Sequence, residues 1–347
     1  MKIPIQNLYY LLTYAWDKLE EADKTEISID DYKDSLNLLA RMLVSGSNYI
    51  LKKGLDKAYI PVVEEYRGIK GKLQFKESLE QQLFSKGKSI CSFDEFSENV
   101  LHNKILKSVL RLLYRLPQID QKLRGHIWDS YSRFHGVDEL DVQVSHFRQL
   151  QIHRNNYHYD FLMRVCKLVV ENSVIDEGTG GIIFKDFLRN ESAMAKLFED
   201  FVRNFYAREQ KKYKVSRENI DWYVEGESNG PLSFLPRMQT DITLEADDHK
   251  LIIDTKYYQK TLSVHFNTEK YHSTNLYQIY SYLTNLEKDT RNPNNLTCDG
   301  MLLYPTTQTH LDATYTLGNH KLRIATVDLN QNWKTIHNRL LELIKDT

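Results

Sequence analysis

The stretch that decides the fold is MQTDITLEADDHKLIIDTKYY, Met238 to Tyr258. Two runs of strand-forming residues are joined in it by the polar residues DDHK, 247–250. In the second run, residues 251–253 are continuously apolar, which is typical of a strand covered on both faces. Asp254 interrupts that run and Lys256 follows two positions later. Because a charge in a buried strand costs free energy, these two residues need a reason to be there.

The length of the turn decides which residues of the two strands face each other. A two-residue loop at Asp247-Asp248 places Asp241 opposite Asp254, whereas a loop one residue longer shifts this register. Directly opposed residues have Cβ atoms about 4.5–5.5 Å apart. Two carboxylates at that separation repel each other, and a hard cation such as Mg²⁺ relieves the repulsion. The hairpin therefore predicts a metal site.

Side chains on a strand alternate between its faces, so Lys256 points the same way as Asp254. An ammonium beside a metal-bound water can orient or help deprotonate the nucleophile and can offset charge in the transition state. A metal ion lowers the pKa of its bound water. Two acids, a lysine and a metal suit phosphodiester hydrolysis. The hairpin alone leaves open a solvent-facing surface pair of Asp254 with Lys256.

The totals narrow the class of protein. A chain of 347 residues favours two domains, and its formal net charge of −1 gives no global basic footprint for nucleic acid. The three cysteines are far apart and form no CxxC pair, which favours a reducing cytoplasm. No apolar stretch approaches the roughly 18 residues needed to span a bilayer, and the N-terminus lacks a cleavage site. We expect a cytoplasmic protein without a membrane association.

The first half of the chain is predicted to be a mostly helical domain, residues 1–175. It begins with a helix over 7–20, for which Asn7 is a plausible cap. Two short extended runs surround a polar connection, Arg67 to Lys72, and predict a β-hairpin within this helical domain. Residues 176–187 contain three glycines within four positions and are predicted to be a linker. Their GTGG lacks the ending of a Walker loop, so we expect no nucleotide to bind this chain.

The second domain, residues 188–347, has a different pattern. Helices and strands alternate in it and predict a mixed sheet flanked by helices, an α+β or α/β class. The expected helices and strands are helix 191–211, strands 221–224, 239–245 and 250–258, helix 270–287, strands 299–305 and 322–329, and helix 333–344.

Further residues complete a family pattern. Glu199 lies in the helix before the sheet, and Gln278 and Tyr282 lie four apart on one face of the helix after it. In order with Asp241 and Asp254-x-Lys256, they resemble the PD-(D/E)xK nuclease superfamily and its RecB-like branch, although Thr240 replaces the proline of the motif.

That resemblance implies roles for these residues. Asp241, Asp254 and the Thr255 carbonyl would hold Mg²⁺, for which Mn²⁺ could substitute. Lys256 would activate the attacking water, and Glu199 and Gln278 would support the metal. Arg237 and Tyr282 are candidate DNA contacts, with a structural ion pair equally open for Arg237.

A more specific resemblance covers nearly the whole chain. The segments IPIQNLYYLLTYAWD, YRGIKGKLQF, LPRMQTDIT and TEKYHSTNLYQIYSYL are similar to the McrC family of restriction subunits. The resemblance implies an endonuclease subunit that docks on a hexamer of the GTP-hydrolysing AAA+ subunit McrB, stimulates its GTPase and cleaves double-stranded DNA containing 5-methylcytosine. It makes the turn with Arg67, Lys70 and Lys72 the candidate stalk that enters the ring, where an exposed basic turn is the plain alternative.

Two other functions remain open at this stage. One is a non-catalytic DNA-binding adaptor that keeps a nuclease-like fold only to activate the partner's GTPase. The other is a nuclease that acts alone on DNA ends or on RNA. The intact acid, acid and lysine set favours catalysis over the first. The long N-terminal domain without a base-reading module favours a partner over the second.

Overall fold

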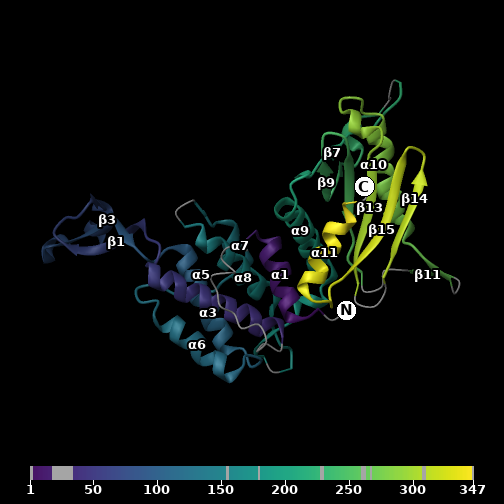
Figure 1. Ribbon diagram of the computed structural model, residues 1–347. Coiled ribbons are helices and arrows are strands. Elements are labelled where there is room, and N and C mark those ends of the chain that lie inside the picture. The colour runs from purple at the N-terminus through teal and green to yellow at the C-terminus, as the bar shows by residue number, and fades with distance from the viewer. Residues whose placement is uncertain are drawn as a thin grey trace. The chain divides into compact units, whose positions relative to one another are not determined.

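The computed structural model describes residues 3–17, 34–153, 156–178, 180–226, 230–258, 263–265, 268–306 and 310–345 (Figure 1). The chain divides into two compact units. Unit 1 joins Met1–Ser35 to Asp186–Thr347, and unit 2 is Leu36–Lys185. The first 35 residues thus differ from the predicted division, which placed them in the N-terminal domain.

Unit 2 is a helical body that carries a small sheet. The apolar side chains of its helices repeat with helical spacing, and on α5 they leave Leu106, Val109 and Leu113 fully buried or nearly so. Helix α5 packs against α6 and α8. The helices are α3 (Ser35–Lys53), α4 (Phe75–Glu80), α5 (Leu101–Arg115), α6 (Gln121–Ser132), α7 (Val144–Arg148) and α8 (His158–Asn172).

The small sheet corrects the predicted hairpin. Strand β1 (Ala58–Arg67) pairs along its whole length with β3 (Lys88–Ser97), which the sequence did not predict. Strand β2 (Lys72–Leu73) pairs with the other edge of β3, so the order is β1-β3-β2. The turn folds against β3 because Gly71 has a φ of 69°, and a Cβ there would lie 2.5 Å from the Ser92 carbonyl oxygen.

The glycine-rich stretch predicted as a linker is part of another hairpin. Strands β4 (Ser173–Ile175) and β5 (Ile182–Phe184) pair antiparallel, and the glycines lie in the turn between them. The Gln118 side chain donates to the Phe184 carbonyl and accepts from its N–H, at 2.9 and 3.2 Å. These bonds hold the hairpin to unit 2, and the units change at Asp186.

Unit 1 is built on a six-stranded sheet in the order β14-β15-β13-β10-β9-β6. Strands β10, β13 and β15 are parallel to one another, and the other three are antiparallel to their neighbours. Every residue of β10 is buried, which explains its continuous apolar run. The strands of this sheet are β6 (Lys214–Ser216), β9 (Ile242–Glu245), β10 (Lys250–Thr255), β13 (Asp299–Thr306), β14 (Asp312–Leu317) and β15 (His320–Asp328).

Three differences from the predicted strands have local causes. Residues 221–224 are not a strand, and strands β6 and β7 (Asn219–Ile220) come before them. The predicted strand 239–245 is split into β8 (Met238–Gln239) and β9, and β8 pairs with β7. Strand β14 was missed because it is an exposed edge without an apolar run. Two short strands, β11 (Ser263–His265) and β12 (Thr268–Lys270), pair with each other.

Helices cover both faces of the large sheet (Figure 1). Helix α10 (Ser273–Glu287) packs on one face, where Leu283 shares a cluster with Ile252 of β10. Helix α9 (Glu191–Glu209) packs on the other, where the rings of Phe198 and Tyr257 lie 6.5 Å apart. Helix α11 (Trp333–Leu343) contacts β15.

The first helix, α1 (Ile5–Ala15), belongs to unit 1 because it packs on α9 and α11. Its N-cap is Pro4, so the predicted cap at Asn7 is wrong. The buried Asn7 amide instead donates to the carbonyls of Leu329 and Gln331, at 2.8 and 2.7 Å. None of the helices in the described residue ranges has the length and apolar character that a bilayer crossing requires.

Candidate active site

Two aspartates meet at the end of the β9–β10 hairpin. The turn is Asp247-Asp248, closed by a 2.9 Å bond from Ala246 N to His249 O. The two strands pair Ile242 with Ile253, so the next pair outward is Asp241 with Asp254. The register predicted from a two-residue loop is therefore confirmed.

Asp254 is a buried carboxylate with too few partners. It is 1% exposed, its Oδ2 lies 2.8 Å from Lys256 Nζ, and its Oδ1 accepts no hydrogen bond from the described residues. The pKa of Asp254 is raised to about 7, mainly by burial; the Lys256 charge lowers it and the Asp241 charge raises it. The protein thus keeps a carboxyl group at a position where its ionised form is costly.

Asp241 is held in place by the residue after Asp254. Its Oδ2 accepts hydrogen bonds from the backbone N–H and the Oγ1 hydroxyl of Thr255, at 2.8 and 3.0 Å. Two donors of Thr255, the last residue of β10, fix the direction of this carboxylate, so the separation of the acids does not depend on a mobile side chain.

Lys256 is tied to helix α10 through a short chain of hydrogen bonds. Its Nζ donates to Gln278 Oε1 at 2.9 Å, and Gln278 Nε2 donates to the Tyr282 hydroxyl at 2.9 Å. Burial works to lower the pKa of Lys256, but the charges of Asp254 and Asp241 outweigh it and the pKa is raised. Lys256 therefore stays charged beside the two acids.

One predicted acidic residue, Glu199, has its partners elsewhere. The Glu199 carboxylate pairs with Lys196, Arg203 and Arg217. The structure does not bring Glu199 to the aspartates because α9 covers the face of the sheet opposite α10, whereas Asp254 points toward α10. In the part of the chain that the structure describes, no three His, Cys, Asp or Glu side chains gather where they could hold a metal ion.

Arg237 is exposed and comes directly before β8. Its Nε and NH2 donate to Asn219 Oδ1 at 3.0 and 2.7 Å. The acceptor is neutral, so its guanidinium keeps a net charge three residues before Thr240 and close in sequence to Asp241.

A buried amide beside the site was not predicted. Asn275 is 4% exposed, donates to the Tyr304 hydroxyl at 3.1 Å and accepts from the Tyr258 hydroxyl at 3.3 Å. Burial raises the pKa of Tyr304 to about 12, and the Asp254 charge adds to this effect. The signal in the sequence is a polar residue on the apolar stripe of α10, four positions before Ile279.

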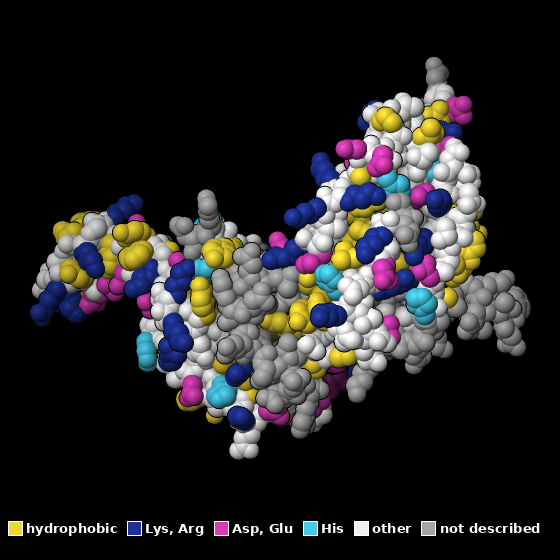
Figure 2. Space-filling model, viewed as in Figure 1, with side chains coloured by type: hydrophobic (Ala, Val, Ile, Leu, Met, Phe, Trp, Pro, Cys, Tyr) yellow, Lys and Arg dark blue, Asp and Glu magenta, His cyan; other side chains and the backbone are white. Residues whose placement is uncertain are grey.

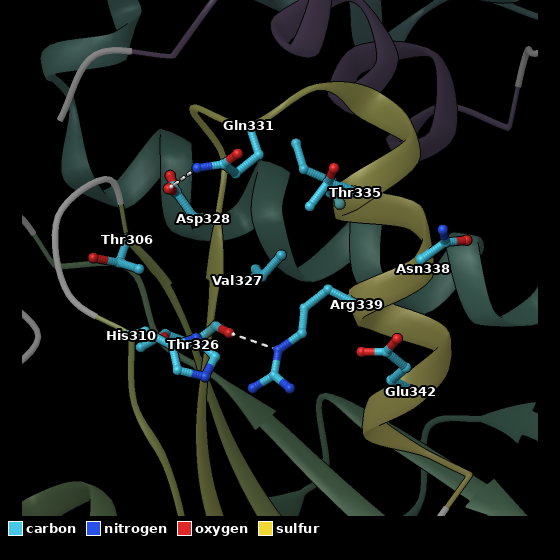
Figure 3. A pocket seen from close by; sticks show the side chains of 11 residues that line it. Thr306, His310, Thr326, Val327, Asp328, Gln331, Thr335, Asn338, Arg339 and Glu342 are labelled. Atoms are coloured by element: carbon cyan, nitrogen blue, oxygen red, sulfur yellow. Dashed lines mark hydrogen bonds between the residues drawn. The ribbon is translucent and has the colours of Figure 1, made fainter.

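A polar pocket at another edge of the sheet is a separate feature. A pocket of about 520 Å³ lies between the ends of β13 and β15 and helix α11 (Figure 3). Two of its charged groups have partners in the protein: Arg339 donates to the Thr326 carbonyl and to Asp312, and Asp328 accepts from Gln331. The aspartate pair does not line this pocket.

Comparison with known proteins identifies a family that this chain matches. The model of the family described as McrBC 5-methylcytosine restriction system component matches residues 5–305. A relative from Escherichia coli (strain K12), described as the type IV methyl-directed restriction enzyme EcoKMcrBC, is 33% identical over 344 residues. The match covers 99% of this chain and 98% of the relative.

A solved structure supports the fold over the same length. It is a half-complex from a tetradecameric assembly of Thermococcus gammatolerans McrB AAA+ hexamers with bound McrC. The match has a TM-score of 0.56 at 15% identity and covers 98% of this chain and 76% of that chain.

Proposed function

Because this chain belongs to the family of McrBC 5-methylcytosine restriction system components, we propose that it is the endonuclease subunit of such a system. In this proposal, unit 1 hydrolyses phosphodiester bonds of methylcytosine-containing DNA with Mg²⁺. Unit 2 docks on a hexameric ring of a McrB-like AAA+ partner and stimulates its GTPase. The observation that carries the catalytic part is the buried Asp254, which lies opposite Asp241 and whose Oδ1 has no hydrogen-bond partner among the residues that the structure describes.

The donor set fits a hard divalent cation. Asp241 and Asp254 offer carboxylate oxygens side by side, and oxygen ligands in small number are what Mg²⁺ uses when substrate phosphate and water complete its shell. The Thr255 carbonyl is the third proposed ligand. When bound, the cation would lower the pKa of an attacking water and neutralise charge on the phosphate.

The other proposed catalytic roles belong to side chains of this protein. Lys256 stays charged between Asp254 and Gln278, so it can orient the attacking water and offset charge that develops on the phosphate oxygens. Gln278 holds the ammonium and is itself held by Tyr282. Arg237, whose charge has a neutral partner, is the proposed contact for a DNA phosphate next to the cleaved one.

The β1–β3 hairpin is the proposed docking element. Large apolar side chains on it are exposed, including Tyr59 at 72%, Val63 at 62% and Ile69 at 69% (Figure 2). Exposed apolar groups in such number mark a surface that binds another protein. Arg67, Lys70 and Lys72 are the basic residues of its far turn, where Lys70 Nζ lies 3.6 Å from the centre of the Phe93 ring.

The second candidate is a non-catalytic adaptor that binds DNA and activates the partner's GTPase. The orphaned Oδ1 of Asp254 speaks against it, because binding alone gives no reason to keep a costly buried carboxylate.

The deciding experiment compares wild type with Asp254→Ala on methylated plasmid, together with the McrB-like partner, GTP and Mg²⁺. We expect wild type to cut and the variant not to, while both stimulate GTP hydrolysis. Cleavage by the variant at the wild-type rate would overturn the site. Cleavage by wild type without partner or GTP would overturn the docking.

A further inference from the structure

The foot of the β1–β3 hairpin is fixed by a single buried amide. Asn103 of α5 is fully buried, and its Nδ2 donates to two backbone carbonyls, Asp56 O at 3.0 Å and Glu98 O at 2.7 Å. Asp56 comes just before β1 and Glu98 just after β3. One side chain therefore holds both strands of the hairpin where they enter the helical body.

Asn103 is held from a second helix. The hydroxyl of Tyr159 on α8 donates to Asn103 Oδ1 at 2.6 Å and accepts from the Asp56 N–H at 3.2 Å. With these bonds, both N–H groups and the oxygen of the Asn103 amide are used. Since α5 and α8 pack against each other, the hairpin is joined to two helices at one point.

Neighbouring side chains add further contacts between the hairpin and the helices at this point. The Asp56 carboxylate lies 3.0 Å from His102 Nε2 and accepts from Asn156 Nδ2 at 3.0 Å. The rings of His102 and Tyr159 lie 4.3 Å apart. We call Asn103, Tyr159, His102, Asn156 and Asp56 the foot cluster.

The other described contacts at the base of the hairpin are exposed ones, among them the paired hydrogen bonds between Asn99 and Asp138. Along β1, eight of the ten residues are exposed, so this strand buries almost nothing against the helices. The ion pair of Lys57 with Glu98 at the same level is a solvent-exposed one, of the kind that contributes about 0–1 kcal/mol. The foot cluster is therefore the buried part of the connection between the hairpin and the helices.

We propose that Asn103, held by Tyr159, is a positioning residue that joins the hairpin and the helices α5 and α8 into one rigid body, which we call the lever. This inference rests on the proposed function, in which the hairpin enters the partner ring. When the connection at the foot cluster is rigid, a movement of the hairpin also moves the helices. When it is flexible, the hairpin moves and the helices do not follow. The foot cluster then determines how many GTP molecules the ring hydrolyses for each DNA cut, without touching the DNA or the catalytic aspartates.

The lever itself is tested by distance measurement on the full chain. Spin labels are placed at Lys86→Cys near the far turn and at Lys122→Cys on α6, because both positions are exposed and the three native cysteines are buried. We expect one narrow distance distribution in the otherwise unchanged protein. Tyr159→Phe should broaden it at least about twofold and Asn103→Ala more, since a lost buried partner frees both strands.

The matched control is Tyr131→Phe, which removes another hydroxyl of unit 2, one that donates to Glu139 and bonds no member of the foot cluster. It should leave the distribution unchanged. Equal widths in all four proteins would overturn the lever, and so would equal broadening by the control. Tyr159→Phe keeps the ring and its packing, so it decides the matter even if Asn103→Ala fails to fold.

Coupling is then measured with the McrB-like partner, GTP, Mg²⁺ and methylated plasmid. For Tyr159→Phe we expect GTPase stimulation within about twofold of wild type and at least about a threefold rise in GTP hydrolysed per cut. A wild-type ratio in a variant with a broadened distribution would overturn the coupling role. If wild type neither stimulates nor cuts, the proposed function fails, while the label distances still decide whether the foot is rigid.

Discussion

Strand β10 carries two buried charges that differ in how they are satisfied. Lys250 and Asp254 lie four residues apart on the same face, and each is 1% exposed. Lys250 Nζ donates to Glu218 Oε1 at 2.8 Å and to Asn295 Oδ1 at 2.7 Å. The two carboxylate oxygens of Asp254 share one charged partner, Lys256, and the carboxylate of Asp241 lies opposite.

The difference distinguishes a buried charge whose partners belong to the fold from one that only the proposed metal site would complete. A buried ion with hydrogen-bond partners is tolerated as part of the packing, although it adds little net stability. A buried ion that lacks partners and faces a like charge is costly, and it persists where a substrate or cation completes it. We therefore expect opposite results when the charge of either residue is removed: loss of activity for Asp254 and loss of stability for Lys250.

Asp254→Asn should give the largest effect, on activity. Removing a carboxylate ligand should lower cleavage of methylated DNA by at least about 10³-fold, because several kcal/mol of metal-derived stabilisation is lost. Without Mg²⁺ the same variant should unfold at a temperature equal to or above wild type, since the repulsion with Asp241 is gone. Plasmid cleavage and thermal denaturation in EDTA measure the two effects.

The control for that substitution is Asp221→Asn, which changes an exposed aspartate and should leave both measurements unchanged. If Asp254→Asn lost stability in EDTA as well as activity, Asp254 would be a fold-stabilising charge and the comparison with Lys250 would collapse.

Lys250→Met should reverse the pattern. The substitution keeps the length of the side chain but leaves Glu218 and Asn295 without their partner, at a cost of about 3 kcal/mol in unfolding free energy. Cleavage per folded molecule should stay near wild type. Urea denaturation measures the loss, with exposed Lys321→Met as the control. A folded but inactive Lys250→Met protein would show that Lys250 also serves the site.

How far the sequence predicts this site depends on the range of each contact. Asp241 faces Asp254 because of a two-residue turn, and Gln278 meets Tyr282 because of helical spacing, so both pairs are readable from local patterns. Glu199 was misplaced because the face of the sheet that α9 covers is decided by packing across the whole unit. A motif spacing carries no information on that choice.

The same reasoning explains the errors in the fold. Strand β3 is central in its sheet but half exposed, so its residues lack the apolar run that identifies a buried strand. Asn7 has the chemistry of a cap, yet it bonds two carbonyls more than 300 residues away in the chain, as the separations of 322 and 324 show. Contacts of that range are fixed by tertiary structure and leave no local trace.

Mg²⁺ binding should change the stability of the Lys250 and Asp254 variants differently, and this effect should be smaller than the two described above. A cation that binds only the folded protein stabilises it by about 2.7 kcal/mol at a hundred times its dissociation constant. Wild type and Lys250→Met should both gain stability as Mg²⁺ is titrated, and Asp254→Asn should not. Thermal denaturation against Mg²⁺ concentration is the measurement, with Na⁺ at matched ionic strength as the reference. An equal gain in Asp254→Asn would place the cation elsewhere.

Gln278→Leu tests the support of the lysine beside Asp254. The substitution removes the acceptor for Lys256 Nζ and the donor to Tyr282, and we expect cleavage to fall about 10-fold, the size of one lost hydrogen bond to a charged group. Stability should change little because the site faces other polar groups. Single-turnover cleavage at saturating partner and GTP measures the rate.

Tyr282→Phe gives the finer control, since it keeps the ring in the cluster with Ile252 and removes only the hydroxyl at the far end of the chain of bonds. Its effect should be smaller than that of Gln278→Leu, about threefold, because the Lys256 to Gln278 bond remains. An effect as large as that of Gln278→Leu would mean that Tyr282 touches the DNA directly. In that case the salt dependence of binding should stay as in wild type, because a tyrosine hydroxyl neutralises no phosphate charge.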